Sequence, residues 1–256
     1  MNTCDLPIKS DPETVIVSGN VRIPVVAFGP RWLVVEKPCG MSIHNDPGSD
    51  LCSLTLAAVH AGCLSAVDQD LSAIHAVHRI DRDTSGIVML AGDPKTLAFF
   101  GNQFAAKAVL KQYLAVVHGF LQGPSGDQER ADWNWPLAAG AAGRNDPAGK
   151  GKRNPCTTRW RILAHRLHYS LVECEPLTGR KHQIRRHAKL AGHPVVGDRR
   201  YGSARSLAYL HRHHGFNRLG LHAHALTLRL PGEAGTTTFH SGGLPRAMRH
   251  LLEMDR

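Results

Sequence analysis

Short runs rich in β-branched and other apolar residues recur along the chain between turn residues, and this pattern predicts β-strands. Two such runs, residues 21–28 and 31–38, are rich in β-branched residues and are bounded by glycine and proline. Together they predict a β-hairpin. Further strands are predicted at residues 87–91, 111–117, 157–164, 169–175, 224–230 and 236–240.

Within residues 111–117 the alternation separates two faces of one strand. The two faces carry Tyr113, Ala115 and Val117 on one side, and Gln112, Leu114 and Val116 on the other. Taken alone, Tyr113 is either an aromatic of the core or sheet edge, or a platform on which a base can stack.

A period of three to four residues predicts helices at residues 95–110, 179–192 and 244–254. The second helix has one apolar face, which consists of Ile184, His187, Ala188 and Ala191. Thr178 precedes this helix and suits its N-cap. His182 and His187 are five residues apart and would not share a face, so we expect no zinc site there.

The remaining segments lack either period. Residues 1–20 are polar and are expected to form an N-terminal extension, with one compact domain over residues 21–256. Residues 122–132, 138–155 and 203–220 are rich in glycine, proline or charge and are expected to be surface loops. The basic residues of the second loop either contact phosphate or are simply solvated; they are Arg144, Lys150, Lys152 and Arg153.

Charge changes the picture, because 31 Lys and Arg oppose 21 Asp and Glu, for a formal net charge of +10 and a pI near 9.6. A polyanion such as a nucleic acid is favoured, since each neutralised phosphate releases counterions. The alternative is a solvated basic surface without a ligand.

The six cysteines form no C-x-x-C pair and no regular framework, which is typical of reduced thiols. No apolar run approaches the ~20 residues needed to span a bilayer, and the N-terminus lacks the features of a signal peptide. We therefore expect a cytoplasmic protein without a membrane segment.

Residues 78–86, HRIDRDTSG, combine two acids, two arginines, two hydroxyls and a glycine between an apolar lead-in and a strand. Thr84, Ser85 and Gly86 offer hydroxyls and a permissive backbone that could hold this loop in one shape. The segment is either an Asx-type turn with a salt bridge, or a loop that presents Asp81 for chemistry.

Four ordered motifs together resemble the RluA-type RNA pseudouridine synthases, over about residues 25–240. They are EKPCG at 36–40, HRIDRDTSG at 78–86, KQYLAVVHG at 111–119, and GRKHQIRRH at 179–187 followed by GHPVVGD at 192–198. The wording of the last motif is closest to the TruC-like branch, which modifies transfer RNA. One departure is Ile80, where the family usually has Leu; the volume is kept, so the loop should be intact.

The resemblance implies an α+β pseudouridine synthase fold, with a mixed, largely antiparallel central sheet flanked by helices and loops around a basic cleft. It implies a reaction that needs neither a cofactor nor a metal, in which Asp81 is the catalytic carboxylate and acts either as a nucleophile at C1′ or as a base at C2′. Arg185 is implied as the salt-bridge partner that keeps Asp81 charged and directed.

For the RNA, the resemblance places Tyr113 as the platform of a flipped uracil, Ile184 on the other side of the ring, and Arg79 in the gap left behind. Further RNA-binding candidates are Arg82, Lys111, Arg180 and Lys181.

The implied partner is transfer RNA or large-subunit ribosomal RNA, bound by a monomer that needs no other protein. A separate S4 RNA-binding domain is not expected. Two rival functions stay open: an RNA-binding protein that has lost catalysis, and a hydrolase that releases free uracil.

Overall fold

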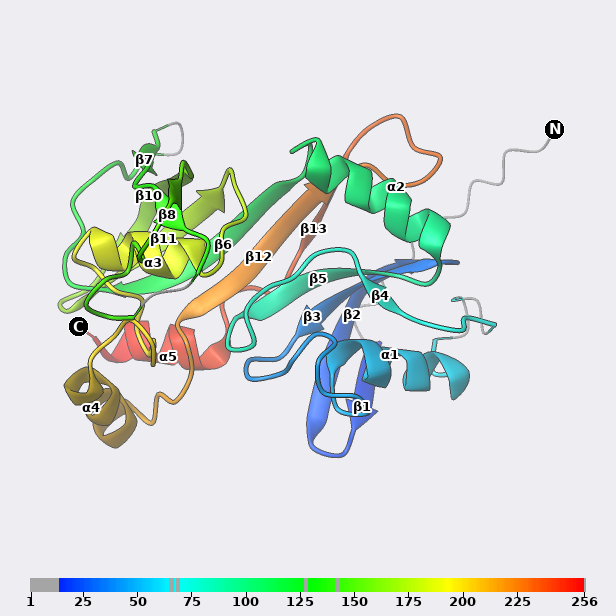
Figure 1. The fold of residues 1–256 in the computed structure, drawn as a ribbon. Coiled ribbons are helices and arrows are strands. Elements are labelled where there is room, and N and C mark those ends of the chain that lie inside the picture. Colours follow the sequence, from blue (N-terminus) through cyan, green and yellow to red (C-terminus); the bar gives the residue numbers. More distant parts are fainter. Residues whose placement is uncertain (1–13, 65–66, 68–69, 127–128, 141–142, 256) are drawn as a thin grey trace. The chain divides into compact units, whose positions relative to one another are not determined.

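The computed structural model describes residues 14–64, 67, 70–126, 129–140 and 143–255. The chain forms two compact units, one of Met1–Val109 with Ala225–Ser241, the other of Leu110–His224 with Gly242–Arg256. The fold class is α+β, with a mixed, mostly antiparallel sheet and five helices among the described residues, as predicted (Figure 1). Strand β12, Leu221–Leu228, contributes residues to both units. The description of residues 21–256 as one domain stays a prediction.

In the first unit, antiparallel strands follow the order β1-β2-β3-β5. Their bounds are β1 Val15–Ser18, β2 Val21–Gly29, β3 Trp32–Lys37 and β5 Ser85–Ala91, with β4 His75–Ala76 paired to β5 and β13 Thr237–His240 paired to β12. The predicted hairpin over residues 21–38 is confirmed, because Gly29 of β2 faces Trp32 of β3.

The expected extension over residues 1–20 is too long at its C-terminal end. Residues 1–13 lie outside the described residues, but Val15–Ser18 pair with β2 and the Ile16 side chain is buried. An apolar Ile-Val pair next to a hairpin thus extends the sheet by one strand.

Helices α1, Leu51–His60, and α2, Pro94–Ala105, bury the two faces of the first unit's sheet. Alternate residues of β3 divide between two hydrophobic clusters. Leu33 and Val35 join the cluster that contains α1, whereas Val34 joins the cluster that contains Phe100 of α2. The helix predicted at 95–110 is shorter than expected, because Lys107 takes a left-handed conformation (φ 55°) and Leu110 begins the next strand.

In the second unit, antiparallel strands follow the order β6-β11-β10-β7. Their bounds are β6 Leu110–His118, β11 Tyr169–Pro176, β10 Thr158–His165 and β7 Ala131–Trp133; a separate pair joins β8 Leu137–Ala138 to β9 Arg153–Asn154.

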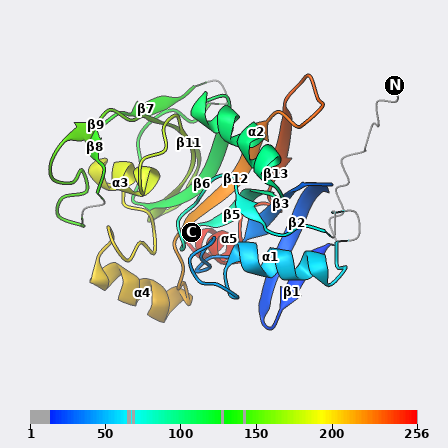
Figure 2. The same ribbon diagram turned by 45° about the vertical axis from the view of Figure 1, so that its right-hand side comes forward.

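The alternation predicted for β6 is confirmed, and both of its faces are covered. Ala115 and Val117 pack in the cluster of α3, Gln183–Leu190, which lies against β10 and β11 (Figure 2). Val116 packs in the opposite cluster with α4, Ala204–His214, and α5, Arg246–Met254.

Two predictions on helix boundaries in this unit are wrong. Helix α3 begins four residues later than expected, since His182 is its N-cap residue and lies in the left-handed region (φ 54°). Thr178 is therefore not the N-cap; its hydroxyl donates to Gln183 Oε1 at 2.7 Å. Residues 203–220, expected to be an irregular loop, contain helix α4.

Of the segments expected to be surface loops, 122–132 ends in the first two residues of β7, and 138–155 is partly ordered by Arg186. This fully buried side chain donates to four carbonyl oxygens, of Pro147 (2.6 Å), Ala138 (3.0 Å), Ala148 (2.7 Å) and Lys181 (3.2 Å). A guanidinium offers five donors in a rigid fork, so one side chain can fix several turns of irregular backbone. Within the described residues, no helix is both long and apolar enough to cross a membrane.

We predict that Arg186→Met lowers the free energy of unfolding by about 3 kcal/mol or more, because buried carbonyls lose their donors. Urea unfolding, followed by circular dichroism, measures this. The control is Lys181→Met, which removes an exposed cation next to the same helix and should change stability by less than about 0.5 kcal/mol. Equal losses in the two variants would contradict the assignment.

Candidate active site

The HRIDRDTSG loop lies in the first unit, between β4 and β5. Asp81 is half-buried, and its carbonyl accepts from the Thr84 amide at 3.1 Å, which closes a tight turn. His78 Nε2 accepts from the Met89 amide at 3.1 Å, and its ring stacks on Phe104 with centroids 5.0 Å apart. The loop is therefore fixed on both sides of Asp81.

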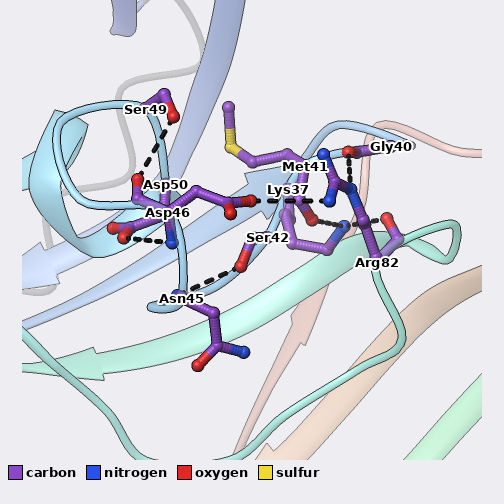
Figure 3. Close-up of polar contacts among 9 residues, drawn as sticks. All are labelled: Lys37, Gly40, Met41, Ser42, Asn45, Asp46, Ser49, Asp50 and Arg82. Carbon is purple, nitrogen blue, oxygen red and sulfur yellow. Dashed lines mark hydrogen bonds and ion pairs between the residues drawn. The ribbon is translucent and has the colours of Figure 1, made fainter.

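A buried lysine of the EKPCG motif contacts this loop (Figure 3). Lys37 has no exposed surface, and its Nζ donates to the carbonyls of Pro38 (2.8 Å), Met41 (2.9 Å) and Arg82 (2.9 Å). Three acceptors match the three donors of an ammonium group. The role of Lys37 was missed from the sequence; the signal was a lysine two residues after the apolar run Trp32–Val35.

Further bonds join the same two segments. The Gly40 amide donates to the Arg82 carbonyl and Arg82 Nε donates to the Gly40 carbonyl, both at 2.9 Å, while Cys39 Sγ donates to the Asp83 carbonyl at 2.9 Å. The EKPCG motif is thus a clamp on the residues directly after Asp81.

Arg82, predicted to contact phosphate, also lies 3.6 Å from a carboxylate oxygen of Asp46 (Figure 3). Its side chain is 67% exposed, so this ion pair is screened by water. A phosphate contact for Arg82 stays a prediction. The placement of Arg79 in the gap left in the RNA also stays a prediction; its side chain is exposed.

The segment from Lys37 to α1 is held by its own polar contacts (Figure 3). Asp50 caps α1 by accepting from the Ser53 amide at 2.8 Å, and its other oxygen accepts from the Asp46 amide at 3.2 Å. The Ser42 hydroxyl accepts from the Asn45 amide at 3.1 Å. The segment that contains the clamp thus starts at the end of strand β3 and leads into helix α1.

One expectation about the loop is corrected. The Thr84 hydroxyl was expected to help hold its shape, but this oxygen is buried without a hydrogen-bond partner among the described residues. The shape depends instead on backbone carbonyls that face Lys37, Cys39 and Gly40.

The other predicted site residues lie in the second unit. Tyr113 of β6 is half-buried, faces Cys174 of β11 and packs on the cluster that contains Ile184 of α3. Lys111, two residues earlier on the same strand, is also half-buried, and burial lowers its pKa from the ordinary value. Arg180 and Lys181 are exposed on the turn before α3.

The GRKHQIRRH motif forms the turn that leads into α3, and Gln183 organises it. Its Oε1 accepts from the Thr178 hydroxyl (2.7 Å) and the Arg180 amide (3.0 Å), and its Nε2 donates to the Thr157 carbonyl (2.9 Å). Next to it, His182 Nδ1 lies 3.0 Å from the Tyr201 hydroxyl.

His187 is a buried, neutral part of this network. Burial lowers its pKa below the usual value. Because the carbonyl of Trp135 can only accept, His187 Nε2 carries the proton and donates to it at 3.0 Å, while Nδ1 accepts from the Thr158 hydroxyl at 3.0 Å. His187 is therefore structural, as the apolar face of the predicted helix required.

Arg185 makes a bidentate pair with Asp198, the last residue of the GHPVVGD motif. Nε donates to Oδ2 at 2.7 Å and Nη2 to Oδ1 at 2.9 Å, and both side chains are buried. Burial alone would raise the Asp198 pKa, but the bonds from Arg185 and from the Tyr201 and Arg200 amides outweigh it and lower that pKa below its ordinary value.

The turn before Asp198 needs glycine. Gly197 has φ +73°, and a Cβ there would collide with the Arg218 carbonyl. Asp198 is the functional residue that sequence reasoning missed in this unit, although the motif that contains it was recognised.

The predicted catalytic residues are divided between the two units: Asp81 belongs to the first, Tyr113 and Arg185 to the second. Their assembly into one site, including an Asp81–Arg185 pair, stays a prediction. No group of three or more His, Cys, Asp or Glu side chains among the described residues is placed to hold a metal ion.

A model of the RNA pseudouridylate synthase family matches residues 31–190, which include the clamp, the Asp81 loop, strand β6 and helix α3. The chain belongs to this family. A relative, ribosomal large subunit pseudouridine synthase C of Vibrio vulnificus, is 34% identical over 230 residues, covering 84% of this chain and 65% of that protein. Its namesake in Vibrio cholerae is 39% identical over 194 residues, covering 75% of this chain and 56% of that protein.

This family member thus spans less than two thirds of the length of those two relatives. Among solved structures, human RNA Pseudouridylate Synthase Domain Containing 4 aligns with a TM-score of 0.65 and 24% identity, covering 88% of this chain and 90% of that one. The likeness confirms the predicted pseudouridine synthase fold.

Because the Asp198 carboxyl has a lowered pKa in the folded state, its stabilisation is complete above the unfolded-state pKa, ~4, and is lost as pH falls through the lower folded-state value. We predict that Asp198→Asn is about 3 kcal/mol less stable than the wild type at pH 7, and that this gap narrows below about pH 4. Urea unfolding between pH 3 and 7 measures it.

The matched control is Asp132→Asn in the same unit. Asp132 lies 3.6 Å from Arg159 with 46% of its side chain exposed, so its loss should cost less than about 1 kcal/mol. A stability gap for Asp198→Asn that stays constant down to pH 3 would argue against an ionised, paired carboxylate.

Proposed function

We propose that this protein isomerises uridine to pseudouridine in structured RNA, with Asp81 as the catalytic carboxylate. One observation carries the proposal: the chain belongs to a family of RNA pseudouridylate synthases, and its Asp81 loop is clamped by the EKPCG motif. A carboxylate that attacks or deprotonates a sugar must be held in one direction, and the clamp supplies that rigidity.

The reaction breaks the N1–C1′ bond of uridine, turns the uracil and joins C5 to C1′. The proton of C5 is released and N1 gains one, so atoms and charge balance without an oxidant or a cofactor. Asp81 either attacks C1′ or removes a proton at C2′; both routes require an ionised carboxylate.

The target nucleotide must leave the RNA stack before its sugar can be reached, at a cost of a few kcal/mol. Tyr113 and Ile184 are proposed to receive the uracil between them. Their membership of one cluster in the second unit supports this, and stacking on an aromatic ring is worth ~1–3 kcal/mol per base. Arg79 is proposed to fill the gap in the RNA.

Arg185 is proposed to direct Asp81. Its pair with Asp198 uses Nε and Nη2, so a bond to Asp81 has to use the remaining guanidinium protons. On this view Asp198 orients the arginine and is a positioning residue rather than a catalytic one.

For the RNA, we propose large-subunit ribosomal RNA. The two Vibrio relatives are named as synthases of the ribosomal large subunit, which supports this, and the formal charge of +10 suits a polyanion. Transfer RNA is the alternative substrate, and the gene-deletion experiment described below distinguishes the two. We further propose that the protein acts as a monomer in the cytoplasm without an obligatory protein partner.

We predict that Asp81→Asn lowers the rate of pseudouridine formation by about a thousandfold or more, because an amide can neither attack nor accept the proton. RNA affinity should stay within about tenfold, since binding rests on phosphates and stacking. The test incubates purified protein with unmodified transcripts and counts pseudouridine by carbodiimide-stop sequencing.

Asp83→Asn is the matched control, because it makes the same change two residues later and its carbonyl, not its side chain, meets Cys39. It should keep turnover within a few fold. Full turnover in Asp81→Asn would remove Asp81 from its role, whereas binding without turnover in the wild type would favour a protein that has lost catalysis. Release of free uracil would point to a hydrolase.

We predict that Tyr113→Phe keeps the affinity for RNA, whereas Tyr113→Ala weakens it at least about fivefold, because only the alanine variant removes the stacking ring. Dissociation constants from filter binding decide this. A large loss of binding in Tyr113→Phe would contradict a platform that works through its ring face.

The substrate is identified by deleting the gene in its host and mapping which pseudouridine disappears from total RNA. A lost site in large-subunit ribosomal RNA supports the proposal. A lost site in transfer RNA overturns the ribosomal assignment and leaves the chemistry standing.

A further inference from the structure

Helix α4 presents an aromatic and cationic face to solvent. Arg205, Tyr209, Arg212 and His213 are exposed and lie at spacings of four, seven and eight residues, so they share one side of the helix. We call these four residues the α4 surface. Tyr209 is 51% exposed, and its ring centroid lies 4.6 Å from that of His213.

Charge is concentrated here. Residues 199–220 contain five arginines and no Asp or Glu, so these 22 positions carry +5 of the formal +10 of the whole chain. The next acidic residue along the chain is Glu233. Solvated helix faces usually mix charges of both signs, and the absence of acids in this stretch favours a polyanionic partner.

The helix is held rigidly by its other side. Ser203 caps it by accepting from the Ser206 amide at 3.0 Å, and the Ser206 hydroxyl lies 3.0 Å from His118 Nε2 of β6. Leu210 is fully buried in the cluster with Phe216, and the Phe216 amide donates to the Leu210 carbonyl beyond Gly215. The residues of the α4 surface are therefore not needed to pack the helix against the rest of the unit.

The helix also begins close to the predicted site in the same unit. Five residues separate it from Asp198, the partner of Arg185, and Tyr201 within that stretch stacks under the Arg185 guanidinium at 5.4 Å. The short segment between Asp198 and α4 would therefore fix the position of a ligand on the α4 surface relative to Arg185.

We propose that the α4 surface is a second RNA-docking site, at which Arg205 and Arg212 bind phosphates and Tyr209 stacks on an unpaired base that flanks the target. RNA offers both ligands at once, because its phosphates pair with the arginines and its bases stack on the exposed aromatic ring. The choice of RNA rests on the proposed function, and the site makes substrate selection depend on structure outside the target nucleotide.

The test measures binding of unmodified large-subunit ribosomal RNA transcript as a function of salt. Arg205→Ala with Arg212→Ala should weaken binding roughly tenfold at physiological salt and reduce the slope of log K against log salt by about 1.5. Tyr209→Ala should weaken binding at least about fivefold, and Tyr209→Phe should restore it.

The matched control is Arg246→Ala with Arg249→Ala, which removes two exposed arginines from α5 of the same unit. Alanine favours helix in both pairs, and circular dichroism checks that the variants are folded. Unchanged affinity and salt slope in the α4 variants would overturn the proposal, as would an equal loss in the α5 control.

Pseudouridine formation is measured separately from binding, so that failure of the proposed function can be distinguished from failure of the docking site. If the wild type binds the transcript and the α4 variants do not, the docking site stands even where no pseudouridine is formed. If the wild type forms pseudouridine and the α4 variants bind and turn over like it, only the docking site is lost.

Discussion

A cation is stable inside a protein only where the chain surrounds it with oxygen atoms. Lys37 in the first unit and Arg186 in the second are both fully buried, and each donates to several backbone carbonyls. The constraint works in both directions. The carbonyls satisfy the cation, and the cation forces irregular backbone to bring those carbonyls to one point.

This arrangement explains why the family motifs are separated in sequence. EKPCG and HRIDRDTSG are 45 residues apart at the Lys37–Arg82 bond, yet they act as one clamped loop around Asp81. In the second unit, GRKHQIRRH supplies Arg185 and GHPVVGD supplies Asp198, which meet as a buried pair. Each unit thus contains one rigid polar arrangement, and two of the motifs meet in each arrangement.

The division suggests how chemistry and recognition are distributed. Asp81 lies next to backbone held by the buried Lys37, and Arg185 lies next to the buried Arg186. The arginines of α4, in contrast, lie on the solvent-facing side of a helix that is already packed on its other side. Rigid elements suit a carboxylate that must be aimed, and a pre-formed cationic helix reduces the ordering that RNA binding would otherwise require.

The sequence by itself determined the family, the hairpin, the alternation in β6 and the strands that its apolar runs mark, because these follow from local pattern and from side-chain types in fixed order. It did not predict the short strands β1, β4, β7, β8 and β9. The start of α3 was predicted four residues too early, and α4 was predicted to be a loop although Ser203 and Gly215 cap its two ends. No role was predicted for Lys37 or Asp198. Those features were decided by tertiary structure, since a buried cation or carboxylate acquires its partners only when distant segments fold around it. The hydrogen bonds of Lys37 to Arg82 and of Arg186 to Ala138 and Ala148 have no local signature in the chain.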